Sequence, residues 1–120
     1  MENVAVVGAS PKIERYSNRC MRTLEERGHN PIPVAPARTE ILGRKVYHTL
    51  AEVPGKIDTV TMYMRPYRQA EVLDDAVRIK PRRIIFNPGA ENAAEYDRLR
   101  AAGIEVIEGC TLIMLTTDQF

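Results

Sequence analysis

Residues 4–11 have the sequence Val4-Ala5-Val6-Val7-Gly8-Ala9-Ser10-Pro11, in which an uninterrupted apolar run stops at a glycine. A short run without alternating polar residues is typical of a strand that is buried on both faces of a parallel sheet. Residues 17–27 then place apolar side chains at helical spacing, with Ser17 as the expected N-cap and Gly28 just beyond the helix. The sequence therefore predicts a strand, a glycine loop and a helix.

The rest of the chain continues this alternation. Further strands are expected at 31–34, 46–47, 58–63, 83–86 and 104–107, and helical segments at 49–52, from 66 to 80, at 92–102 and at 112–115. The prolines of the second strand are expected at its ends, because proline cannot donate to a sheet. The pattern predicts an α/β fold, a single Rossmann-like three-layer domain over residues 1–120 with a mostly parallel sheet of about five strands.

Ligands of such sheets bind beyond the carboxyl ends of the strands. This rule directs attention to the segments 8–17, 35–45, 63–67, 87–92 and 108–111. Asn87 could position a ligand there, Asn92 is expected to cap the following helix, and Glu91 is the one carboxylate that could serve as a general base. We predict no catalytic residue, because no partner acid or nucleophile accompanies it.

The overall charge excludes some partners. Seventeen Lys and Arg against sixteen Asp and Glu leave a formal charge of +1, which argues against a nucleic-acid-binding protein. Residues 1–48 nevertheless carry eight basic and five acidic residues, a local excess that suits a small anionic ligand. Two cysteines, no signal-peptide pattern, no long apolar run and no metal-ligand spacing lead us to expect a cytoplasmic protein without a membrane segment or a metal.

The first loop is suited to phosphate groups. Gly8 permits a tight turn, the following helix offers free N–H groups, and Ser10 adds a hydroxyl. Lys12, Arg15 and Arg19 add positive charge. The alternative is an ordinary strand-to-helix turn with a solvated basic rim.

The loop departs from the dinucleotide fingerprint G-x-G-x-x-G, because its second and third glycine positions hold Ser10 and Ile13. The acidic residue that binds the ribose of NAD is also missing, and Arg38 stands near its place. Arg38 could pair with a ribose phosphate. The residues thus favour NADP or coenzyme A over NAD. Arg44 and Lys45 could join Arg38 at that phosphate, or all three could lie in a solvated loop.

Several motifs resemble one family. Residues 4–11, Arg15-Tyr16-Ser17, Gly28-His29 and Pro33-Val34-Ala35-Pro36 resemble the free-standing bacterial CoA-binding proteins, which are similar to the CoA-binding domain of the succinyl-CoA synthetase alpha subunit. The resemblance continues through Ile41-Leu42-Gly43, Val46-Tyr47 and Asp58-Thr59-Val60, and it covers residues 3 to about 109. Ala35 departs from the family's usual asparagine, which removes a polar contact.

The resemblance implies coenzyme A binding in an extended site. Gly8, Ala9, Ser10 and Lys12 would contact phosphates, with Arg15 close by. Val34 and Pro36 would line the adenine side, and Tyr63, Met64 and Arg65 would lie along the ligand. Tyr16 could stack on the adenine, cover the phosphates or simply pack. The complete set of expected binding residues is Gly8, Ala9, Ser10, Pro11, Lys12, Arg15, Tyr16, Ser17, Val34, Pro36, Arg38, Tyr63, Met64 and Arg65.

Three functions fit the sequence. The favoured one is a module that binds coenzyme A or an acyl-CoA and performs no catalysis alone, working as a homodimer or with a partner enzyme. The second is an NADP-binding reductase subunit. The third is a Rossmann-like interaction scaffold without a ligand.

Overall fold

The computed structural model describes residues 1–120 and contains a five-stranded sheet in the order β2-β1-β5-β6-β7. The strands are β1 (Asn3–Val7), β2 (Asn30–Val34), β5 (Thr59–Met62), β6 (Arg83–Phe86) and β7 (Glu105–Glu108). Every neighbouring pair is parallel. The predicted Rossmann-like α/β fold with five parallel strands is therefore confirmed.

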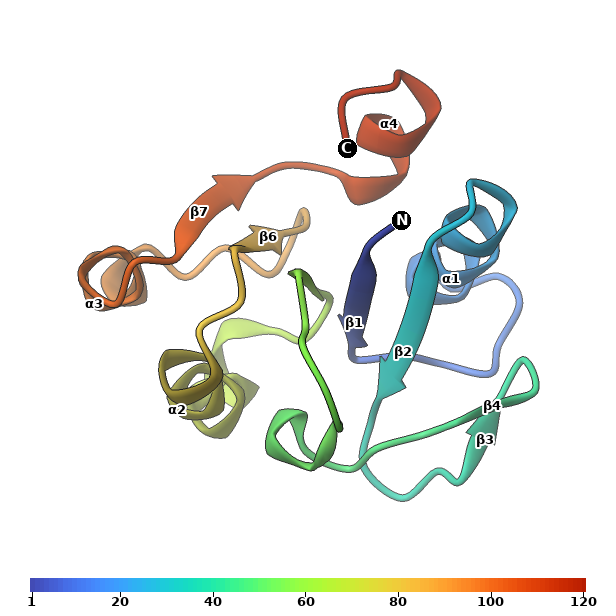
Figure 1. Ribbon diagram of the computed structural model, residues 1–120, viewed down its shortest axis with the longest axis horizontal. Helices are drawn as coiled ribbons and strands as arrows, with labels where there is room; N and C mark the ends of the chain where they lie inside the picture. Colours follow the sequence, from blue (N-terminus) through green and yellow to red (C-terminus); the bar gives the residue numbers. More distant parts are fainter.

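Helices cover both faces of this sheet (Figure 1). α1 (Tyr16–Glu26) and α4 (Thr111–Thr116) lie on one face, and α2 (Ala70–Ile79) and α3 (Tyr96–Ala101) lie on the other. Short 3-10 turns occur at η1 (Leu50–Glu52), η2 (Pro66–Arg68) and η3 (Ala93–Glu95), and β3 (Glu40–Ile41) pairs with β4 (Arg44–Lys45) in a separate hairpin. None of the helices combines the length and hydropathy that a membrane crossing needs.

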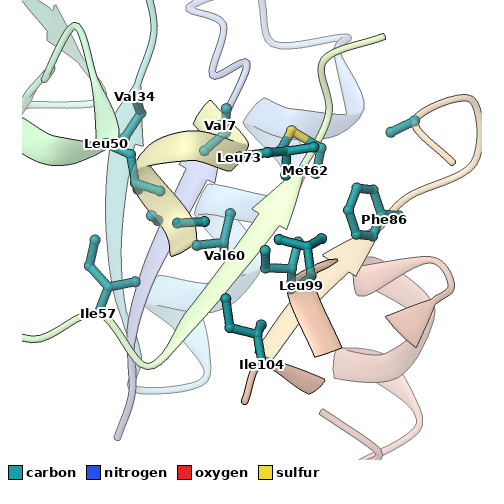
Figure 2. Close-up of a cluster of buried hydrophobic side chains, with 14 of the residues drawn as sticks. Val7, Val34, Leu50, Ile57, Val60, Met62, Leu73, Phe86, Leu99 and Ile104 are labelled. Carbon is teal, nitrogen blue, oxygen red and sulfur yellow. The ribbon is translucent and has the colours of Figure 1, made fainter. Parts of the chain in front are cut away.

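The central strands are buried on both sides, as their uninterrupted apolar runs predict. Val4 and Val6 of β1 pack toward α1 and α4, whereas Ala5 and Val7 belong to the cluster under α2 and α3. In Figure 2, Leu73 of α2 and Leu99 of α3 lie in this second cluster with side chains from the sheet. Burial of side chains on both faces holds the sheet between two helical layers, and the strand-end loops lie at its edge.

Some expected details of the elements are wrong. The N-cap of α1 is Arg15, with an extended backbone and no capping side chain, so Ser17 lies inside the first turn. The expected helix at 92–102 is present, but its first turn is the 3-10 turn η3, which continues without a gap into α3. Asn92 caps no amide with its side chain, since its amide group donates to the Gln69 oxygen.

The second strand differs from its expected form. Pro31 and Pro33 lie within β2 rather than at its ends. β2 tolerates them because it is an edge strand of the sheet. The expected strand at 46–47 is reduced to a single bridge between Val34 and Tyr47, which follows the β3–β4 hairpin.

Candidate functional site

The carboxyl ends of β1 and β5 form the centre of the candidate site. From β1 the chain runs to α1 on one face, and from β5 it runs to α2 on the opposite face. Such a point of divergence leaves a crevice in which α/β proteins bind ligands. Here the crevice is an open cleft of about 520 Å³. We call it the basic cleft, and it is lined by Gly8, Ser10, Lys12, Arg15, Tyr16, Ser17, Arg38, Tyr63, Arg65, Pro88 and Gly89.

The basic cleft has a strongly positive lining. Lys12, Arg15, Arg38 and Arg65 all line it, and none of their side chains takes part in an ion pair or a hydrogen bond within the chain. No carboxylate lines the cleft. Four unpaired cations without a local counter-charge produce a positive potential that attracts a polyanionic ligand.

The backbone around the cleft offers a specific set of donors. The amides of Gly8 and Ala9 donate to the Val34 carbonyl, at 3.0 and 3.3 Å, so neither is free for a phosphate in this conformation. The amides of Tyr16 and Ser17 have no acceptor within the chain, because they begin α1. A phosphate in this cleft would therefore meet the start of α1 rather than the turn at Gly8.

The loop between β1 and α1 is held by its own side chains. Ser10 Oγ accepts the Lys12 amide at 3.1 Å, and Asn18 Nδ2 donates to the Ser10 carbonyl at 2.9 Å. Asn18 is buried, and its oxygen accepts from Arg22 Nε. Sequence reasoning missed Asn18, although a polar side chain on the apolar side of a helix is the usual sign of such an anchor.

Gly8 must be a glycine in this fold. Its φ is +89°, and a Cβ atom at this position would lie 3.2 Å from Met64 Cγ and from the Met64 amide nitrogen. The close approach brings the end of β1 against the end of β5. This contact brings the loops that follow β1 and β5 close together at the basic cleft.

A second cavity of about 320 Å³ adjoins the basic cleft on the α2 side of the sheet. We call it the adjoining pocket, and its lining is Val7, Val34, Ala35, Pro36, His48, Thr49, Met64, Arg68, Glu71, Val72 and Asp75. Three segments of the chain line both cavities. Val7, Pro36 and Met64 line the adjoining pocket, and the nearby residues Gly8, Arg38 and Tyr63 line the basic cleft. A ligand with an anionic part and an apolar ring can occupy both.

The structure brings together most of the expected binding residues. The basic cleft contains Gly8, Ser10, Lys12, Arg15, Tyr16, Ser17, Arg38, Tyr63 and Arg65, and the adjoining pocket contains Val34, Pro36 and Met64. Ala9 and Pro11 line neither cavity: Ala9 is buried beneath α1, and Pro11 is exposed in the loop.

Tyr63 turns its hydroxyl away from solvent. The hydroxyl is buried and has no hydrogen-bond partner within the chain. Burial, followed by the neighbouring Cys20, raises the pKa of the Tyr63 phenol. The hydroxyl is therefore neutral at physiological pH and faces the packed interior beside Cys20.

The structure does not place three further sequence candidates at the basic cleft. Arg44 pairs with Glu25 at 2.9 Å and, like Lys45, lies along the outer edge of β2, so neither joins Arg38. Asn87 is buried and fully used: its Nδ2 donates to Thr61 Oγ1 and the Met62 carbonyl, and its Oδ1 accepts the Thr111 amide. These hydrogen bonds join the ends of β5 and β6 to the start of α4, so the Asn87 side chain is not available to a ligand.

Comparison with known families identifies the family of the chain. A sequence model of the CoA binding domain matches residues 2–116. The chain belongs to this family. This match confirms the resemblance found in the sequence. Membership of the family supports coenzyme A binding in general.

Individual relatives of this CoA-binding domain fall into two kinds. Uncharacterized protein YneT of Bacillus subtilis (strain 168) is 29% identical over 106 residues, which are 88% of this chain and 78% of YneT. A solved structure of an uncharacterized protein is 37% identical, with a TM-score of 0.93 and coverage of 100% of this chain and 98% of the other. Trans-feruloyl-CoA synthase FCS1, from an unknown prokaryotic organism, is 34% identical over 119 residues, or 90% of this chain but 17% of the synthase.

Proposed function

We propose that this CoA-binding domain is a module that binds coenzyme A or an acyl-CoA and performs no catalysis by itself. The phosphates lie in the basic cleft against the start of α1, and the adenine lies in the adjoining pocket. The observation that carries the proposal is the set of four unpaired cations, Lys12, Arg15, Arg38 and Arg65, in a cleft without a carboxylate. Coenzyme A carries a pyrophosphate and one ribose phosphate, which this charge suits.

The side chains of the basic cleft support binding more than chemistry. They are cations, hydroxyl groups, glycine and proline, and they include no histidine, cysteine or carboxylate that could move a proton or attack a thioester. The domain's match to 17% of a CoA synthase fits a binding unit that elsewhere is joined to catalytic parts. We infer that this chain presents its ligand to a partner enzyme or to a second copy of itself.

Calorimetric titration with coenzyme A, dephospho-CoA, NADP and NAD tests this function. We expect coenzyme A to bind tightest and dephospho-CoA to bind about tenfold more weakly, because it lacks the phosphate that Arg38 would pair with. A preference for NADP would replace the proposal with a reductase subunit. Failure of all four nucleotides to bind would leave an interaction scaffold.

A pair of arginine variants sharpens the test. Arg38→Met should weaken coenzyme A but leave dephospho-CoA unchanged, because only the former has a phosphate at Arg38. Arg44→Met is the matched control, since Arg44 is paired with Glu25 away from the cleft. Equal effects of Arg38→Met on both ligands would place the ribose phosphate elsewhere.

A further inference from the structure

The adjoining pocket has polar side chains on its rim, and two of them, Asp75 and Thr49, are already engaged. Asp75 accepts hydrogen bonds from Arg78 and from the Ala51 amide. Thr49 donates its hydroxyl to Glu52 at 3.0 Å. These contacts hold η1 against α2, so the polar groups of Asp75 and Thr49 are occupied within the chain.

Glu71 is the exception among the acidic residues of α2. Asp74 pairs with Arg98 at 2.9 Å and Asp75 pairs with Arg78, whereas Glu71 makes no ion pair and no hydrogen bond. Glu71 lies four residues before Asp75, on the same face of the helix, and both line the pocket. It is therefore a free acceptor at the rim of an otherwise mainly apolar pocket.

His48 supplies a second free acceptor. Its Nε2 lies 3.0 Å from the Arg38 carbonyl oxygen, and a carbonyl oxygen can only accept. When the ring carries a single proton, this contact places it on Nε2 and leaves Nδ1 with an unshared electron pair. Both His48 and Glu71 line the adjoining pocket, where Arg68 is the one cationic side chain.

We propose that Glu71, assisted by His48 Nδ1, selects adenine by accepting hydrogen bonds from its 6-amino group. The inference rests on the proposed function, which puts the adenine of coenzyme A in this pocket. Adenine offers two N–H donors at position 6 between the acceptors N1 and N7. Two acceptors therefore match the amino group, and Arg68 can donate to a ring nitrogen. Hypoxanthine carries a carbonyl oxygen at position 6, which the Glu71 carboxylate would repel, and its protonated N1 leaves one N–H donor on that edge in place of the two of the amino group.

The test compares coenzyme A with the analogue in which hypoxanthine replaces adenine, by calorimetry on the full chain. The wild-type chain should bind the analogue about tenfold more weakly, because a hydrogen bond to a charged acceptor is exchanged for a repulsion. Glu71→Ala should move the ratio of the two affinities most of the way toward one, and His48 Nδ1 accounts for the remaining preference. Alanine suits this exposed helical position, and circular dichroism verifies the fold.

Asp74→Ala is the matched control. It removes the same charge from the neighbouring turn of α2, but Asp74 does not line the pocket. Either variant should bind the polyanionic ligand slightly better through its lost negative charge, so the ratio between coenzyme A and its analogue is the diagnostic quantity. Asp74→Ala should keep the wild-type ratio.

The outcomes separate this inference from the proposed function. Tight binding of both coenzyme A and its analogue by the wild-type chain would overturn the role of Glu71 and leave coenzyme A binding intact. An unchanged ratio in Glu71→Ala would do the same. Absence of coenzyme A binding in the wild-type chain would overturn the proposed function and this inference with it.

Discussion

Gly8 occupies the point where β1 ends, with a φ of +89° and its backbone against Met64. Replacing it with alanine adds a left-handed backbone penalty and pushes Met64 and Tyr63 away. We expect Gly8→Ala to lower the free energy of unfolding by about 1–3 kcal/mol, measured by urea denaturation. Gly103→Ala is the control, because its φ is +85° but nothing lies within 4 Å of the added Cβ. Equal losses in the two variants would contradict the steric role of Met64.

Cys20 makes the stability of the protein depend on pH in the alkaline range. Burial raises the pKa of its thiol from 9.0 to about 12. The unfolded chain therefore ionises Cys20 more readily than the folded chain, so the contribution of Cys20 to stability should be constant below about pH 9 and fall as the pH rises toward 12. The expected slope is up to about 1.4 kcal/mol per pH unit.

Urea denaturation at several pH values measures this slope. Cys20→Ala should lack this contribution, most clearly below about pH 10, where the buried Tyr63 phenol does not yet add a slope of its own. Cys110→Ala, which leaves Cys20 in place, should keep it. A difference in unfolding free energy between the wild-type chain and Cys20→Ala that does not change between pH 9 and pH 11 would show that Cys20 ionises equally in the folded state.

At the scale of elements, α2 ends on a strained residue. Lys80, at its C-terminus, has a φ of +51°, and its amide donates to the Ala76 carbonyl at 2.8 Å. Glycine adopts this conformation without the steric penalty of a side chain. Lys80→Gly should therefore stabilise the protein by roughly 1 kcal/mol in urea denaturation. Lys80→Ala, which keeps the Cβ atom, should show no comparable gain; an equal gain would point to the charge of Lys80 instead.

Elements with a clear local pattern could be predicted from the sequence. Uninterrupted apolar runs predict β1 and β6, and helical spacing of apolar residues predicts α1. Each of these patterns can be read from residues that are neighbours in the sequence. The 3-10 winding of the turn before α3 could not be predicted in the same way. Asn92, which precedes this turn, is held by a residue that is distant in the sequence, since its side-chain amide donates to Gln69. Its backbone amide donates to the hydroxyl of Tyr96, four residues later.

For the whole molecule, the residues that the sequence could bring together correctly are those that topology alone places. Parallel strands bring the loops after β1 and β5 together, so Ser10, Lys12 and Arg65 could be assigned to one crevice. Arg44 could not be excluded from it, because its pairing with Glu25 joins segments that the sequence does not show to be neighbours. The number of charged residues in a sequence segment thus indicates a ligand site less reliably than the charged side chains that the folded structure leaves without an ion-pair partner.

The central claim is that phosphates of coenzyme A bind between the first loop and the start of α1. Titration of Ser10→Asp with coenzyme A, beside Ser10→Asn, tests it most directly. Both variants keep an oxygen that can accept the Lys12 amide, as Ser10 Oγ does, so the turn is preserved. Only aspartate adds a negative charge. We predict that Ser10→Asp weakens coenzyme A binding by about a hundredfold or more while Ser10→Asn stays close to the wild-type chain. Unchanged affinity in Ser10→Asp would contradict the account, because it would put the phosphates outside the basic cleft.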